Sequence, residues 1–221
     1  MNRINRTSND QGTAFFGKMT AGISHELMNI LAIIRERSGL IEDLMALDKE
    51  ADFPYRDKLA ATLTSIREQV GRGMQAGEKL NQLAHSMDES RARLQVDDLL
   101  DRIAFLMQRF ARLEKIEIKA VPTEPPMTVD TDPFRILLVL AACIEYCMDR
   151  TTVGGEIVLQ CMPTQGGTAI RCSSDRGPNP VEGAETIQHL QDRLRDPMER
   201  LGAQLCVLSA DNQVGLELIL P

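Results

Sequence analysis

Two long stretches of helical periodicity in the first 90 residues constrain the fold more than any other feature. Their apolar side chains recur at steps of three, four and seven residues, which places them along one face of a helix. The first stripe comprises Phe16, Met19, Ile23, Leu27, Ile30, Ile34, Ile41 and Leu44. The second comprises Tyr55, Leu59, Leu63, Ile66, Val70, Met74, Leu80, Leu83 and Met87. The short connection around 47–54 predicts that the two helices form an antiparallel hairpin.

A single hairpin leaves one side of each apolar stripe in water. Pairing two hairpins into a four-helix bundle buries both stripes, so we expect a two-fold homodimer. The alternative is a hairpin that packs only on the rest of its own chain.

One histidine lies on the outer side of the first predicted helix. At about 100° per residue, His25 is roughly 200° from Ile23 and therefore faces away from the apolar stripe. Asn29 follows one turn later on the same face. The other residues of this face are small: Ala21 at its edge, Gly22 and Ala32. His25 is thus expected on a nearly flat surface, although exposed histidines often have no function.

A zinc site at His25 is excluded by spacing. The His-Glu-x-x-His motif needs a second imidazole one turn after the first, because both must reach one metal ion. Asn29 occupies that position, and the only other histidines, His85 and His189, are far away in the sequence. We therefore expect no metal site in this chain.

The rest of the chain, from residue 94, alternates between strand and helix patterns. Strands are predicted at 94–96, 115–121, 127–130, 156–162, 168–173, 204–209 and 215–220, and helices at 97–114, 132–148 and 184–201. Asp97 and Asp132 are the expected N-caps of the first two of these helices. The prediction is an α+β chain: a disordered N-terminus over 1–11, a hairpin domain over 12–90, and an α/β sandwich over 94–221 with helices on one face of a mixed sheet.

Composition excludes several classes of function. The formal net charge of -7 argues against nucleic acid as a partner. No apolar run reaches the roughly 18 residues of a membrane span, and the polar start lacks the core of a signal peptide. The five cysteines have no metal-type spacing and lie mostly in apolar runs. They are expected to be buried, reduced thiols of a cytoplasmic protein.

The segment 22–31, GISHELMNIL, resembles the phospho-acceptor box of bacterial two-component sensor histidine kinases. It keeps the histidine (His25), the adjacent acid (Glu26), the asparagine (Asn29) and the flanking leucines. It departs from the box at Met28, which is usually basic, and at Ile30, which is usually proline.

The order of elements after residue 94 resembles the ATP-binding domain of the same kinases, but the nucleotide machinery is degenerate. Asp132-Pro133 opens the expected helix, yet the magnesium-binding asparagine falls at Tyr146, a poor magnesium ligand. The motif Asp-x-Gly-x-Gly keeps Asp175 and Gly177 and loses its second glycine. The glycine-rich lid has no counterpart.

The resemblance implies a dimeric histidine phosphotransferase that takes a phosphoryl group from one response-regulator receiver aspartate and passes it to another. His25 would carry the group, Glu26 would orient the ring or act as base, and Asn29 would donate a hydrogen bond. The chain would need no cofactor of its own, since the receiver brings the magnesium.

The receiver would dock on Ala21, Gly22 and Ala32, together with Gly73 and Gly77. Counting from the turn places Gly77 level with His25, and the two glycines allow either a partner's backbone or a close helix contact. Two other functions stay open: an ATP-dependent histidine kinase with a divergent pocket, and a scaffold that binds receivers without taking phosphate. The sequence names neither the regulators nor the direction of transfer.

Overall fold

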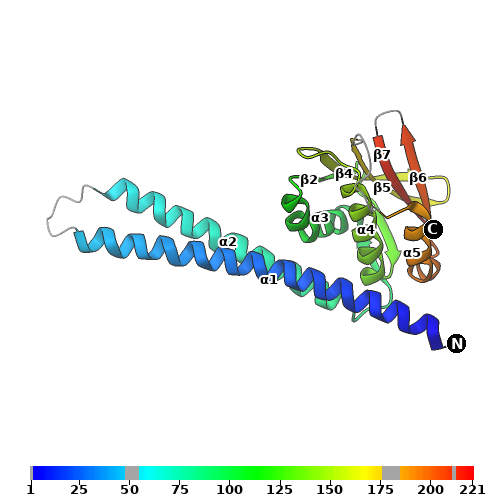
Figure 1. The fold of residues 1–221 in the computed structure, drawn as a ribbon, viewed down its shortest axis with the longest axis horizontal. Coiled ribbons are helices and arrows are strands. Elements are labelled where there is room, and N and C mark those ends of the chain that lie inside the picture. The colour runs from blue at the N-terminus through cyan, green and yellow to red at the C-terminus, as the bar shows by residue number, and fades with distance from the viewer. Residues whose placement is uncertain (1, 48–54, 176–184, 211–212) are drawn as a thin grey trace. The chain divides into compact units, whose positions relative to one another are not determined.

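The computed structural model describes residues 2–47, 55–175, 185–210 and 213–221 (Figure 1). The chain forms two compact units. One is Thr20–Gln82, and the other combines Met1–Met19 with Leu83–Pro221. Residues 12–19, which the sequence places with the hairpin, thus group with the C-terminal part of the chain.

Two long helices form the predicted hairpin. Helix α1 spans Asn2–Leu47 and α2 spans Arg56–His85. The sequence predicts a disordered N-terminus over 1–11, whereas α1 begins at Asn2. Residues 2–11 contain no glycine and no proline. Extending an existing helix over such a segment costs far less free energy than nucleating a new one.

Only part of each hairpin stripe is buried in the single chain. Ile23, Ile30 and Leu44 of α1 are buried, as the periodicity predicts. On α2 the predicted stripe is largely open: Leu63 is 42%, Val70 44% and Met74 72% exposed. The hairpin by itself therefore leaves a row of apolar side chains without a partner.

The C-terminal unit is built on a five-stranded mixed sheet in the order β2-β4-β5-β7-β6. The strands are β2 (Glu117–Val121), β4 (Glu156–Thr164), β5 (Gly167–Asp175), β6 (Gln204–Ala210) and β7 (Gln213–Leu220). Only the β2–β4 pair is parallel. Strands β1 (Ala92–Gln95) and β3 (Thr128–Thr131) form a separate antiparallel pair.

Three helices, α3 (Val96–Leu113), α4 (Pro133–Met148) and α5 (Ile187–Leu201), cover the buried face of this sheet (Figure 1). Alternate residues of the strands point into it, among them Leu159, Ile170 and Leu218. The other face carries polar pairs such as Arg171 and Glu217, which face each other on β5 and β7 with Nε and Oε1 2.6 Å apart. The predicted α+β class and one-sided sheet are confirmed.

Local sequence predicts the N-cap of one helix correctly and that of another incorrectly. Asp132 caps α4 as predicted, because its carboxylate accepts the backbone N–H groups of Phe134 and Arg135. The prediction for Asp97 is wrong: α3 starts after Gln95, and the Asp97 carboxylate instead accepts the backbone N–H of Thr123. A distant loop thus competes for the carboxylate that sequence reasoning assigned to the helix end.

Burial of α4 predicts a large cost for removing one of its core side chains. Leu140 is fully buried, so Leu140→Ala should lower the free energy of unfolding by about 2–5 kcal/mol. Leu113→Ala is the matched control, since Leu113 is 71% exposed. Urea unfolding of the full chain followed by circular dichroism measures both. Equal midpoints for the two variants would contradict this packing.

Candidate functional site

His25 lies in the middle of α1 with its ring exposed, as predicted. Asn29, one turn further along, is exposed as well. The neighbouring apolar residues Ile23 and Ile30 are buried on the opposite side of the helix. The geometry leaves the ring accessible to another molecule.

The surface around His25 differs in part from the prediction. Ala21 and Ala32 are exposed, but Gly22 is buried. Two large apolar side chains are also exposed on α1 near His25: Met28, three residues further on, is 65% exposed, and Leu31 is 57% exposed. The surface beside His25 is thus more apolar than the small residues alone suggest.

Glu26 is engaged by a residue that the sequence did not single out. Its Oε1 accepts a hydrogen bond from Nη2 of Arg72, which forms an ion pair between α1 and α2. Among the described residues, no hydrogen bond joins Glu26 to the His25 ring. The role of Glu26 in orienting that ring therefore stays a prediction.

The two glycines of α2 differ in their surroundings. A side chain at Gly73 would meet Cγ2 of Ile30 at 3.5 Å, an ordinary contact within the hairpin. A side chain at Gly77 would have no atom within 4 Å. Close packing inside the hairpin therefore gives no reason for Gly77.

Tyr146, the residue that the resemblance aligns with a magnesium-binding asparagine, lies against a cation. Tyr146 is buried, and the guanidinium of Arg150 lies over its ring, 3.6 Å from the centroid. Nη1 of Arg150 donates to the backbone carbonyl of Tyr146 at 2.9 Å, and Nη2 donates to that of Glu185. A magnesium ion at Tyr146 would meet a positive charge and no carboxylate or amide oxygen from this residue.

The cavity next to Tyr146 has the wrong charge for a triphosphate. It encloses about 310 Å³, and its lining holds four carboxylates (Glu114, Glu145, Asp149 and Glu185) against one lysine, Lys18. Burial raises the pKa of the Asp149 carboxyl, and nearby Arg150 acts in the opposite direction. Three of the carboxylates have a cation beside them, because Lys18 pairs with Glu145, Arg193 pairs with Glu185 and Arg150 lies near Asp149. The small excess of negative charge that is left disfavours polyphosphate.

The adjacent face of α4 is covered by the start of α1. Phe15 contacts Phe134 edge to face, with ring centroids 5.6 Å apart, and Lys18 forms an ion pair with Glu145. Ala141 and Ala142 are buried at this face. Since α1 and the acidic cavity occupy this region, the residues present do not fit a bound magnesium nucleotide.

The remaining predicted nucleotide residues are only partly described. Asp175 ends strand β5, and nothing is described of its side chain, while Gly177 lies outside the described residues. Within the described part of the chain, no group of three or more histidine, cysteine, aspartate or glutamate side chains is placed to hold a metal ion.

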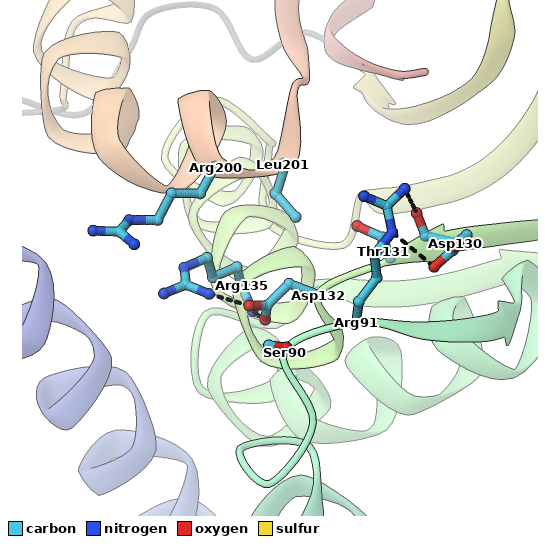
Figure 2. A pocket seen from close by; sticks show the side chains of 8 residues that line it. All are labelled: Ser90, Arg91, Asp130, Thr131, Asp132, Arg135, Arg200 and Leu201. Atoms are coloured by element: carbon cyan, nitrogen blue, oxygen red, sulfur yellow. Dashed lines mark hydrogen bonds and ion pairs between the residues drawn. The ribbon is translucent and has the colours of Figure 1, made fainter.

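A second polar cavity, of about 250 Å³, lies at the start of α4 and the end of α5 (Figure 2). Its lining comprises Ser90, Arg91, Asp130, Thr131, Asp132, Arg135, Arg200 and Leu201. The three arginines are each paired with an aspartate: Arg91 with Asp130, Arg135 with Asp132, and Arg200 with Asp196. The charges in this cavity are thus largely compensated.

Four of the five cysteines are buried, as expected, and Cys206 is exposed, contrary to expectation. Cys143, Cys147 and Cys172 lie close together between α4 and β5. Burial raises the pKa of each of these thiols, that of Cys147 to about 12. They are therefore protonated and unreactive at neutral pH. Cys206 is exposed because β6 is the edge strand of the sheet.

No protein-family model matches the sequence, and no curated protein matches it. Among solved structures, the chain is similar to the catalytic domain of histidine kinase ThkA in a nucleotide-free form, with 15% identity and a TM-score of 0.51. That likeness covers 60% of this chain and 97% of the other. The C-terminal unit has the histidine-kinase catalytic fold. At this identity the likeness establishes the fold alone.

Two more solved structures are similar at lower scores. Histidine kinase ThkA in complex with response regulator protein TrrA has 17% identity and a TM-score of 0.49, covering 95% of this chain and 62% of that one. A bacterial phosphotransferase has 10% identity and a TM-score of 0.47, covering 91% and 94%. Among the described helices of this chain, none has the length and apolarity to cross a membrane.

Proposed function

We propose that this protein is a histidine phosphotransferase that relays phosphoryl groups between receiver domains of response regulators through His25. The observation that carries the proposal is an accessible histidine next to an acid, in a chain whose kinase-like fold does not fit a magnesium nucleotide. A phosphoryl group on His25 must then come from another protein.

The transfer proceeds in two displacements. One ring nitrogen of neutral His25 forms a bond to the phosphorus of a receiver aspartyl phosphate, and the P–O bond to the aspartate breaks. The electron pair of that bond stays on the aspartate, and the ring keeps its proton on the other nitrogen. A second receiver aspartate then attacks the phosphohistidine and frees the ring. The covalent relay divides a transfer between two separate proteins into two accessible steps.

The residues around His25 support this chemistry. The amide of Asn29, which is exposed one turn away, would donate a hydrogen bond to a phosphoryl oxygen. The apolar surface of Met28 and Leu31 offers a docking area for a receiver, together with Ala21 and Ala32. The magnesium that neutralises the phosphoryl oxygens belongs to the receiver.

We also propose that the active form is a homodimer with a four-helix bundle. Its support is the unpartnered row of Leu63, Val70 and Met74 on α2. Burying these rows between two hairpins would stabilise the dimer by roughly 25 cal/mol per Å² of apolar area removed from water.

The main competing function is an ATP-dependent histidine kinase, and the ThkA catalytic fold is the observation that favours it. Arg150 over Tyr146 and the acidic cavity argue against it. A scaffold that binds receivers without taking phosphate would not need the His25 ring.

Phosphate transfer to His25 tests the proposal directly. We expect the chain to acquire an acid-labile, base-stable phosphate when it is mixed with phosphorylated receiver domains. His25→Ala should abolish the labelling, whereas His85→Ala, which changes another exposed histidine, should not. Phosphate-affinity gels and mass spectrometry measure both. Full labelling of the His25→Ala chain would refute the assignment.

Nucleotide binding separates the transferase from the kinase. Because the cavity is acidic and Arg150 lies at the magnesium position, titration with magnesium ATP should give no saturable heat and no thermal shift. Isothermal titration calorimetry is the measurement, with a functional histidine kinase as positive control. Micromolar binding together with labelling of His25 by ATP would support the kinase instead.

Charge placed on the open row of α2 should disrupt the dimer. We expect Val70→Glu to convert the chain to a monomer in light scattering coupled to gel filtration, because the carboxylate would be buried in the bundle. Val153→Glu is the control, since Val153 is 74% exposed in the C-terminal unit. A wild-type chain that is monomeric at every concentration would rule out the bundle.

A further inference from the structure

We infer that Arg72 is a positioning residue for the transfer reaction: from α2 it binds the carboxylate of Glu26, the residue that follows His25, and offsets its negative charge. This inference rests on the proposed function and assigns a role to a residue that sequence reasoning left out.

The first observation is the ion pair itself. Nη2 of Arg72 donates to Oε1 of Glu26, and Nη1 donates to Oε1 of Gln69 at 3.3 Å. The side chain of Glu26 is 24% exposed and that of Arg72 47%. The pair is therefore partly shielded from water, and the guanidinium is held from two sides.

The second observation is the distribution of charge along α1. Between Lys18 and Arg35 the helix carries a single formal charge, that of Glu26. Met28, where the resembled box is usually basic, is apolar and exposed. Helix α1 thus offers no cation near this carboxylate. Arg72 supplies it from the other helix of the hairpin.

The geometry of a helix explains why the carboxylate needs holding. Consecutive side chains diverge by about 100°, so helix geometry alone does not fix where the Glu26 carboxylate lies relative to the His25 ring. Arg72 fixes the carboxylate on the side of α1 that adjoins α2. A fixed carboxylate can stabilise the positive charge that develops on the ring during attack.

The cation has a second effect on an anionic substrate. An unpaired carboxylate next to His25 would repel the incoming phosphoryl group through Coulomb interaction. Pairing with Arg72 makes the local sum of these two charges zero. The proposed role therefore combines placement of Glu26 with removal of that repulsion.

The test uses the full-length chain and single-turnover transfer from a phosphorylated receiver domain at increasing receiver concentration. Arg72→Ala should lower the rate at saturating receiver about tenfold or more, the scale of misplacing a catalytic group. The half-saturating concentration should stay unchanged. Arg72→Lys should recover part of the rate, and Arg67→Ala, which changes an exposed arginine of the same helix, should behave as wild type.

Exchanging the two charged residues distinguishes a positioning role of Arg72 from a purely structural ion pair between the helices. The double variant Glu26→Arg with Arg72→Glu rebuilds an ion pair between the helices, so its melting temperature should match the wild type. Its transfer rate should stay low, because the carboxylate now belongs to α2. Recovery of the wild-type rate in the swap would show that any interhelical pair suffices and would overturn the inference.

Three other outcomes are also decisive. A wild-type rate for Arg72→Ala would overturn the inference while leaving the phosphotransferase proposal intact. If the wild-type chain acquires no phosphate on His25, the proposed function fails, and the inference fails with it. A raised half-saturating concentration with an unchanged maximal rate would assign Arg72 to receiver docking instead.

Discussion

The packing of α4 on the inner face of the sheet is the constraint on which the C-terminal unit depends. Leu137, Leu140 and Ile144 are fully buried in this helix, and α4 contacts β4, β5 and β7. A helix buried on nearly all sides must be apolar nearly all round. The same requirement leaves no room for the polar ligands that a nucleotide-binding helix presents. The core side chains Leu137, Leu140 and Ile144 therefore offer no ligand to a magnesium ion.

The two units solve the burial of apolar surface in opposite ways. The C-terminal unit closes its core within one chain, since its sheet and helices each cover the other's apolar face. The hairpin does not, because two helices alone cannot enclose the row formed by Leu63, Val70 and Met74. Incomplete burial in the hairpin coincides with the exposed histidine. A unit that depends on partners for its apolar surface is suited to protein recognition.

The distribution of charged side chains also differs between the two units. Near His25 the negative charge of Glu26 is balanced by Arg72 across the hairpin. Near Tyr146 the carboxylates of the cavity outnumber its lysine. An anionic group thus meets paired charges near the histidine, and near Tyr146 it meets a cavity whose carboxylates are partly offset by Arg150 and Arg193.

The sequence by itself determined what depends on near neighbours along the chain. Helical periodicity predicted the hairpin and the outward direction of His25, and Asp132-Pro133 predicted the capped start of α4. Each of these features follows from residues within a few positions of one another, so a linear pattern suffices. The apolar run of α4 likewise predicted a buried helix.

Only the tertiary structure decided the features that join distant segments. The pairing of Glu26 with Arg72 links residues 46 positions apart, and it depends on the register between two helices. The burial of Gly22, the capture of Asp97 by the loop at Thr123, and the packing of Phe15 on Phe134 are of the same kind. Side-chain contacts between elements are set by register, twist and crossing angle, and local sequence does not specify these quantities.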